Sequence, residues 1–316
     1  MSGLVWGAVF GFGAASLIAF AALVGVWAER KVSARIQMRI GPQELGPFGL
    51  FQTFSDTVKL VLKEDITPAR VDVRAFRLAP FVVFAPVAAS LVVIPYATGF
   101  APLDMSVGVF FFLAVPGLSV LGVLLAGWAS RNTYATIGGL RAAAQMISYE
   151  LPRTLSVLPV VMLAGSMRPL DIVDEWRWWW IPLTAISFAV YFISSIAELN
   201  RGPFDLPEAE SELVAGYFAD YSGIRWAVFM MAEYGAMLAA GLFAAAVFFG
   251  GAAHLPGVGG TVVLAGTGAL IAIAMMWVKW TFPRMRPDQL MGMAWKVLTP
   301  LALFQIAVVG AVIPWL

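Results

Sequence analysis

Hydrophobic residues in this chain of 316 amino acids gather in long runs that shorter polar stretches separate. About eight of these runs are long enough to cross a bilayer as helices, since a spanning helix needs roughly 20 residues. The runs are residues 4–28, 78–99, 107–128, 142–166, 178–197, 226–250, 261–280 and 297–314. The pattern predicts an all-α fold, a polytopic membrane helical bundle that forms a single integral membrane domain over residues 1–316.

The connection between the first two runs contains a shorter helical pattern. Apolar residues recur there at helical spacing, and polar residues fall on the opposite face. The apolar positions are Phe51, Phe54, Val58 and Val61, and the polar ones are Gln52, Asp56, Lys59 and Lys63. We expect an interfacial amphipathic helix. It is either a platform for a soluble partner or part of a solvated re-entrant loop.

The amino-acid composition limits the class of protein and the cofactors that this chain can bind. Charged residues make up 12% of the chain and hydrophobic residues 60%, whereas a soluble domain has about 25% charged residues. The absence of cysteine excludes disulfides and thiolate-held iron–sulfur clusters, and the single histidine, His254, is too little for an ordinary haem or zinc site. We therefore expect no metal and no redox cofactor bound by this chain.

The positive charges are distributed unevenly between the two ends of the predicted helices. Of the 20 lysines and arginines, eighteen fall on the side of the connections that follow the first, third, fifth and seventh runs: sixteen in these connections, and Arg153 and Lys279 in adjoining runs. The positive-inside rule places these connections in the cytoplasm. We expect both termini on the outer, periplasmic side.

Acidic residues gather in residues 197–234, inside a chain that is otherwise mostly apolar. They are Glu198, Asp205, Glu208, Glu210, Glu212, Asp220 and Glu233. Acids near lipid are costly, so such a segment is buried in protein, faces a water-filled cavity or carries out a function. If the loop is helical, Glu208 and Glu212 share a face while Glu210 points nearly the other way. One of these acids is then expected to bind a proton or an arginine.

Three of the chain's acids are predicted to lie within the membrane near its cytoplasmic face. They are Glu150, Glu198 and Glu233, each near the cytoplasmic end of a predicted helix. The helix of Glu150 also contains Pro152 and Pro159, so we expect it to be kinked or broken. The acids either carry out a function or pair structurally with Arg153, Arg201 or Arg141.

Several long motifs resemble one known family. They are ERK at 29–31, RIGP at 39–42, GPFGLFQ at 46–52, D..KL..KED at 56–65, GLRAAAQMISYE at 139–150, AELNRGPFDLPEAESELVAGY at 197–217, MAEY at 231–234 and PRMRPDQLM at 283–291. Together they resemble subunit 1, also called the H subunit, of respiratory complex I, the proton-pumping NADH:quinone oxidoreductase. The resemblance covers nearly the whole chain. Thr53, Asp220 and Gly235 depart from the family's usual residues.

The resemblance implies a role inside a large complex in the bacterial cell inner membrane. The chain would form much of the quinone-access chamber, with quinone as substrate, and NADH, FMN and iron–sulfur clusters would belong to partner subunits. The partners would be the soluble quinone-site and iron–sulfur subunits, small neighbouring membrane subunits and lipid. By motif match, the proton-relay residues are Glu150, Glu198, Glu208, Glu210, Glu212 and Glu233, and the quinone-chamber residues are Glu29, Arg30, Arg35, Arg39 and Asp56.

Other functions stay open at this point. The homologous subunit of a membrane-bound hydrogenase or of a ferredoxin-fed complex would share these motifs. A stand-alone proton or cation transporter could also bury acids at one face of a bundle, although its site would lie nearer the midplane. A purely structural anchor for a soluble arm is the simplest alternative.

Two surfaces follow from the complex I interpretation. The cytoplasmic connections, above all residues 30–63, should dock the soluble arm. Quinone should enter from lipid between the first helix, the amphipathic helix and the sixth helix, past the small residues Gly11, Gly13, Ala14 and Ala15.

Overall fold

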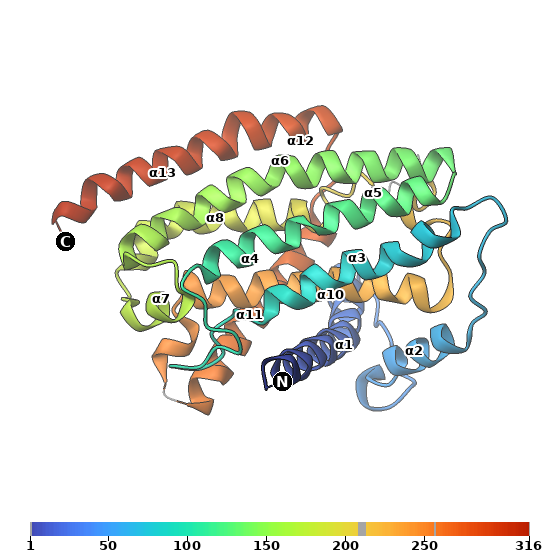
Figure 1. Cartoon of the computed structure of the whole chain (residues 1–316), viewed down its shortest axis with the longest axis horizontal. Coiled ribbons are helices and arrows are strands. Elements are labelled where there is room, and N and C mark those ends of the chain that lie inside the picture. The colour runs from blue at the N-terminus through green and yellow to red at the C-terminus, as the bar shows by residue number, and fades with distance from the viewer. Residues whose placement is uncertain (1, 208–212, 256, 316) are drawn as a thin grey trace.

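The computed structural model describes residues 2–207, 213–255 and 257–315 and shows a bundle of helices with its long axis horizontal in Figure 1. The α-helices are α1 Ser2–Ile36, α2 Gln52–Leu62, α3 Val73–Leu91, α4 Gly108–Gly117, α5 Ser119–Ala129, α6 Thr133–Ala164, α7 Pro169–Glu175, α8 Trp180–Glu198, α10 Gly223–Val247, α11 Val258–Thr281, α12 Pro287–Met293 and α13 Thr299–Val312. Short helical turns are η1 Pro47–Gly49, η2 Gly216–Phe218, η3 Gly251–His254, η4 Ala294–Leu298 and η5 Ile313–Trp315.

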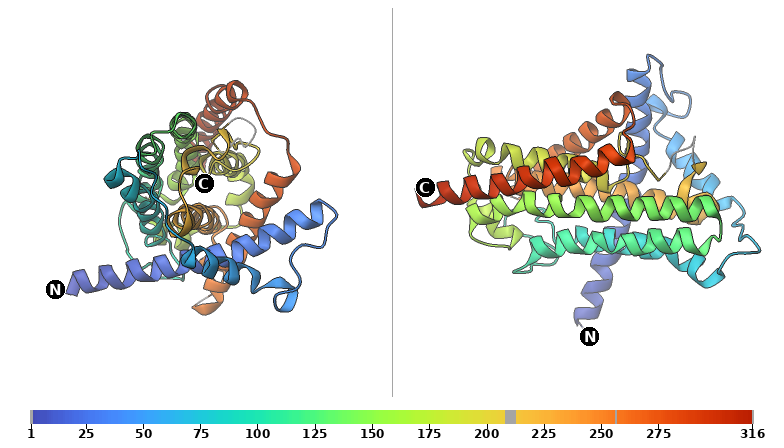
Figure 2. Two further views of the ribbon diagram at one scale, coloured as in Figure 1. Left: turned by 90° about the vertical axis from the view of Figure 1, so that its right-hand side faces the viewer. Right: turned by 90° about the horizontal axis from the view of Figure 1, so that it is seen from above.

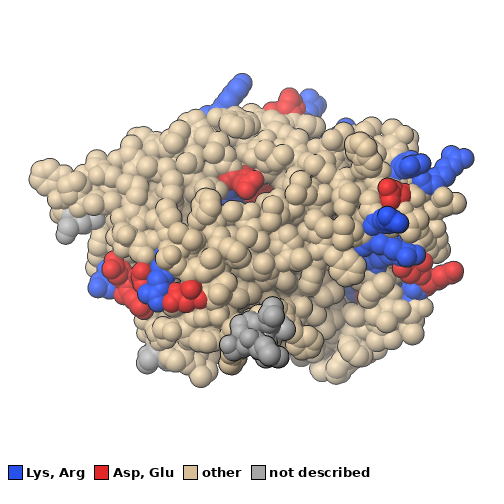
Figure 3. All heavy atoms as spheres, viewed as in Figure 1, with Lys and Arg blue, Asp and Glu red and all other residues tan. Residues whose placement is uncertain are grey.

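The described residues contain seven helices that are long and apolar enough to cross a membrane, or up to eight if a bent pair counts as one span. The bent pair is α6 and α7, which meet at 58°. The all-α polytopic bundle is therefore confirmed. The side of the membrane on which the termini lie stays a prediction, although Figure 3 shows basic side chains gathered at one end of the long axis.

Helix α10 is the centre of the bundle and packs against α1, α3 and α11. Its C-terminal half is made largely of small residues, and residues 239–247 are buried. A Cβ atom on Gly241 would lie 2.7 Å from the carbonyl oxygen of Gly268 in α11. The two backbones approach so closely that only glycine fits there, a common basis of helix association in membranes.

Helix α1 lies across the others. Seen down the long axis in the left view of Figure 2, most helices are end-on while α1 runs sideways past them. It continues to Ile36, eight residues beyond the end we predicted. Hydropathy ends a span at the first charges, but Glu29 is buried and paired here, so the helix goes on. It stops at Met38, which has a φ of 55°, where Arg39 N–H donates to the Ala34 carbonyl at 2.7 Å.

Prolines affect two other predicted spans. The third predicted run is found as one span, Gly108–Ala129, which a single residue, Leu118, just after Pro116, interrupts between α4 and α5. For the helix predicted to be kinked or broken at Pro152 and Pro159, the break is wrong, because α6 is one α-helix from Thr133 to Ala164. Neighbouring helices α5, α8 and α13 pack along it, and such packing lets membrane helices accommodate proline.

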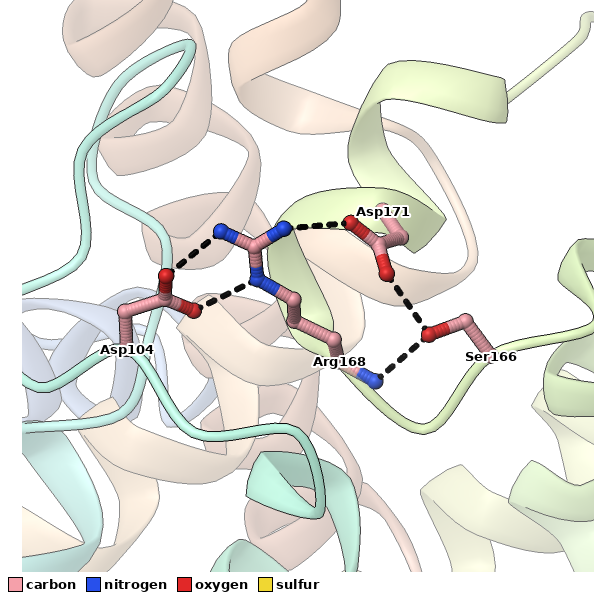
Figure 4. Close-up of polar contacts among 4 residues, drawn as sticks. All are labelled: Asp104, Ser166, Arg168 and Asp171. Atoms are coloured by element: carbon pink, nitrogen blue, oxygen red, sulfur yellow. Dashed lines mark hydrogen bonds and ion pairs between the residues drawn. The ribbon is translucent and has the colours of Figure 1, made fainter.

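A polar cluster joins two loops at the end of the bundle where α7 lies (Figures 1 and 4). Arg168 donates to Asp104 through Nε at 2.7 Å and to Asp171 through a terminal nitrogen at 2.9 Å. Ser166 completes the cluster, since its hydroxyl donates to Asp171 at 2.8 Å. The hydrogen bonds from Arg168 hold the pKa of the Asp104 carboxyl below its usual value. The cluster fastens the loop before α4 to the turn between α6 and α7.

Candidate functional site

A cavity of about 530 Å³ lies between α1, α2 and α10. Helix α1 contributes Ala19, Ala22, Leu23, Val26, Glu29, Arg30 and Ser33 to its wall. These residues extend for about 20 Å along the helix at 1.5 Å per residue. One end of this wall is apolar and the other is polar and charged. The cavity therefore matches an amphiphilic molecule with a long apolar tail and a polar head.

Helix α2 closes this cavity with its polar face. Asp56 and Lys59 line the cavity, and Arg30 of α1 forms an ion pair with Asp56 at 2.7 Å. The predicted apolar face points outward, with exposed fractions of 53% for Phe51, just before α2, and 59% for Phe54, whereas Leu60 lines the cavity. The predicted amphipathic helix is thus confirmed. In this bundle its apolar side is the one left for lipid or a partner.

Behind the polar end of the cavity lies a cluster of buried charges from α1, α10, α11 and the loop after α8. Glu29 accepts hydrogen bonds from Arg201 at 2.9 Å, from the Tyr234 hydroxyl at 2.8 Å and from Lys279 at 2.7 Å. Arg201 also forms an ion pair with Glu233 at 2.7 Å. Arg201 thus bridges an acid of α1 and an acid of α10.

Arg201 is only 2% exposed. Burial by itself would lower its pKa, but the charges of Glu233 and Glu29 outweigh burial and raise the pKa above its usual value. The guanidinium also lies over the Tyr234 ring, 4.5 Å from its centroid. It is therefore a permanent cation held from two sides.

A second, smaller cavity of about 80 Å³ lies on the far side of this cluster, with Glu233 in its wall. Polar groups in the wall include Ser90, Ser119, Ser195 and Asn200. Ser195 Oγ and Asn200 Oδ1 are buried and have no hydrogen-bond partner among the described residues. A polar cavity of this size has room for several water molecules, which would satisfy such groups.

Arg153 of α6 and Glu198 of α8 form an ion pair at the opposite side of the small cavity, and both line it. Their side chains are 6% and 7% exposed. Arg153 also donates to the Leu113 carbonyl at 3.1 Å. Glu150, one turn earlier on α6, is half-buried and close enough to Glu198 to repel its charge. Figure 3 shows an isolated acidic patch in the apolar face near α6 and the α4–α5 junction.

The predicted site residues are thus partly brought together. Glu29, Arg30, Arg39 and Asp56 line the large cavity, whereas Arg35 is exposed and does not. Glu198 and Glu233 line the small cavity, and Glu150 lies beside Glu198. Glu208, Glu210 and Glu212 lie outside the described residues. The residues of the predicted quinone passage at 11–15 do not line this cavity, whose wall on α1 begins at Ala19, and Ala14 is buried in the core.

Sequence reasoning missed Gln145. This side chain is fully buried, and its amide donates to the carbonyls of Ala197 at 2.6 Å and Phe204 at 2.7 Å. It ties the end of α8 to the segment on the other side of Arg201. A glutamine among alanines on the buried face of a long apolar helix is the signal that marked it.

The described residues contain no group of three or more His, Cys, Asp or Glu side chains placed to hold a metal ion. The two cavities are surrounded instead by carboxylates, guanidinium groups and hydroxyls. Such groups can bind a polar headgroup and pass protons.

The chain is similar to known proteins along almost its whole length. A family model described as NADH dehydrogenase matches residues 11–310. The NADH-quinone oxidoreductase H subunit of Brevibacillus brevis is 46% identical over 320 residues, which cover 98% of this chain and 95% of the relative. The corresponding protein of Geobacillus kaustophilus, which has the same name, is 47% identical over 313 residues, 97% of this chain and 94% of the relative.

Proposed function

Since the chain belongs to the H-subunit family of NADH-quinone oxidoreductase, we propose that it builds the quinone chamber in the membrane arm of this enzyme and carries the first acids of a proton relay. NADH, FMN and the iron–sulfur clusters belong to partner subunits. Quinone is the substrate. The membrane is the bacterial cell inner membrane, with both termini on the periplasmic side.

The cavity between α1, α2 and α10 is the quinone chamber of this proposal. Its apolar wall, which includes Leu23, Val26 and Met230, suits an isoprenoid tail. Its polar end, with Glu29, Arg30 and Asp56, suits the headgroup. The outward apolar face of α2 keeps the mouth of the chamber at the level of the lipid interface, where a quinone dissolved in the bilayer can enter.

The surface around this mouth is the proposed docking site for the soluble arm. Lys59 and Arg39 line the cavity at the end of the molecule where basic side chains gather in Figure 3. A soluble quinone-site subunit would complete the headgroup end of the chamber there. Glu150 is half-buried on an otherwise apolar face. A neighbouring small membrane subunit would pack over it, because exposing an acid to lipid costs free energy.

The relay runs from Glu29 through Arg201 and Glu233 into the small cavity, and from there to Glu198, Arg153 and Glu150. Reduction of a quinone to a quinol takes up two electrons, supplied through the partner subunits, and two protons; drawing those protons from groups at the polar end of the chamber would change the charge next to Glu29. The ion pair of Arg201 with one of its two acids, Glu29 or Glu233, would then strengthen while the other weakens. The acids around the small cavity would exchange a proton through the water in that cavity. Glu208, Glu210 and Glu212 would extend the relay through the loop before α10.

One observation carries this proposal: the two cavities share a single cluster as their common wall, in which Arg201 contacts an acid of each cavity. Glu29 lines the large cavity and Glu233 the small one. The competing interpretation is structural. In it, Arg153 and Arg201 neutralise their acids permanently, and the pairs serve only the packing of the bundle.

Replacing Glu198 by glutamine tests the relay in the assembled complex in membrane vesicles. We expect NADH:quinone turnover and proton pumping to fall together, because the two processes are coupled, while assembly is retained. Glu175→Gln is the control, since Glu175 is exposed at the end of α7. Turnover and pumping are measured by NADH oxidation and by a pH-sensitive dye.

A double variant separates the two interpretations. Glu198→Gln alone leaves the buried Arg153 charge without its carboxylate, which is destabilising. The pair Glu198→Gln with Arg153→Met removes both charges at similar volume. If this double variant pumps like the wild type, the acid has only a packing role; the relay requires that pumping stays low.

A further inference from the structure

The junction of α4 and α5 is a helix break beside the relay. Pro116 has no N–H to donate, and the Leu118 N–H bonds to the nearby carbonyls of Val115 and Pro116 rather than to one four residues back. The Leu113 carbonyl accepts a hydrogen bond from Arg153 at 3.1 Å. Arg153 thus contacts the last turn of α4, next to the break.

Glu150 lies against this break at the one position that lacks a side chain. A Cβ atom placed on Gly117 would be 2.5 Å from Glu150 Oε1 and 3.1 Å from its Cδ. Real Cβ atoms do not come so close to another heavy atom. The carboxylate therefore occupies the space that any other residue at position 117 would fill.

The position of Glu150 matters because of Arg153. The two residues are three apart on α6, a spacing that places side chains on the same helix face. Arg153 is already engaged by Glu198 and by the Leu113 carbonyl. A Glu150 carboxylate that left the break would have within its reach the Arg153 Nε, which has no hydrogen-bond partner among the described residues, and it would draw the guanidinium away from Glu198.

We propose that Gly117 is a positioning residue: by lacking a Cβ it forms a seat that holds the Glu150 carboxylate at the α4–α5 break and so reserves Arg153 for Glu198. This inference rests on the proposed relay function and adds a residue to it. Glu150 is then the acid at the α6 end of the relay, kept apart from the ion pair next to it.

Gly117→Ala is a suitable probe because it should fold. The backbone of Gly117 is not in the left-handed region, so alanine fits its conformation. The clash falls on the far end of a flexible glutamate side chain rather than on backbone. Gly266→Ala is the matched control, since Gly266 in α11 has open space around its Cβ position.

The experiment compares Gly117→Ala with the wild type in the assembled complex in membrane vesicles. We expect normal assembly and a fall in coupled quinone turnover and pumping of about 2-fold to about 30-fold, the range of residues that modulate coupling without contacting a ligand. Gly266→Ala should behave like the wild type.

Rescue distinguishes positioning from general damage. Glu150→Asp withdraws the carboxylate by one methylene, about 1.5 Å, so Gly117→Ala with Glu150→Asp should pump better than Gly117→Ala alone. If this rescue fails, or if Gly117→Ala pumps like the wild type, then Gly117 does not position the Glu150 carboxylate. Glu150→Gln tests the relay separately: if Glu150→Gln pumps normally, the proposed function fails at this acid and the seat has nothing to position.

Discussion

At the scale of residues, the buried charges are held by few partners and depend strongly on each of them. Arg201 is in contact with Glu29 and Glu233, and Arg153 with Glu198. Removing one partner of a buried ion pair typically costs about 3–5 kcal/mol, because the remaining charge stays buried. The segment that carries Arg201 must therefore be placed accurately, and Gln145 is the side chain that fixes both of its ends.

Gln145→Ala should lower both stability and coupled turnover. It removes one of the two donors from each of the carbonyls of Ala197 and Phe204, which keep the backbone N–H groups of Asn200 and Leu206, so each lost hydrogen bond should cost about 0.5–1.5 kcal/mol. It also frees the segment that holds Arg201. Thermal inactivation of the complex and pumping well below that temperature are the two measurements.

Gln305→Ala is the control for this prediction. Gln305 in α13 is also buried and donates to a backbone carbonyl, that of Leu183 in α8, but it lies away from Arg201 in the chain. Its loss should reduce stability and leave pumping per turnover unchanged. Equal pumping defects in both variants would mean that Gln145 has no special role in positioning.

At the scale of elements, hydropathy located the membrane helices well, because a spanning segment must be apolar whichever other helices pack against it. It failed at the ends and breaks. The extension of α1 to Ile36 depends on Arg201, which lies 172 positions from Glu29 along the chain. The break at Leu118 and the unbroken course of α6 through Pro152 likewise depend on packing against other helices. Such long-range partners are not visible in the local pattern of residues.

The loop cluster of Figure 4 should hold at neutral pH and loosen in acid. The pKa of Asp104 is lower in the folded protein than in the unfolded chain. The stabilisation is therefore fully present above the unfolded value of about 3.9, and is lost as the pH falls through the lower folded value. Asp104 faces Arg168, which also binds Asp171. Since an arginine stays charged over this pH range, protonation of the Asp104 carboxylate is what breaks its pair with Arg168.

Hydrogen exchange of the amides near Val109 measures this effect, because Val109 N–H donates to the Met167 carbonyl beside the cluster. Asp104→Asn should exchange faster than the wild type at neutral pH. The difference should shrink once the carboxyl of the wild type is protonated. Since both side chains are about 40% exposed, solvent screens the pair and the effect should be modest.

At the scale of the whole molecule, the large cavity, as the proposed quinone chamber, would determine which quinones fit. Ala22 lines its apolar part, while the neighbouring Phe20 is 64% exposed and does not line it. Ala22→Trp should fill part of the path of an isoprenoid tail. We expect the Michaelis constant to rise more for long-tailed quinones than for short-tailed ones.

Phe20→Trp controls for a bulky residue on the outer face of α1. It should change the Michaelis constant neither for long-tailed nor for short-tailed quinones. Quinone reduction by NADH in membranes, measured for a series of tail lengths, gives the comparison. If Ala22→Trp changed the Michaelis constant equally for all tail lengths, the isoprenoid tail would not pass Ala22.

The cluster between the two cavities has a further consequence, which follows from electroneutrality. It combines two cations, Arg201 and Lys279, with two anions, Glu29 and Glu233, and so carries no net charge. A neutral cluster built around the buried Arg201 cannot accumulate charge cheaply. In the proposed relay it would act like the dielectric of a capacitor: a charge that arrives on the side of the large cavity would polarise the cluster, and an equal charge would leave or enter on the side of the small cavity. Transmission across the cluster would then need no electron and no proton to travel the whole distance.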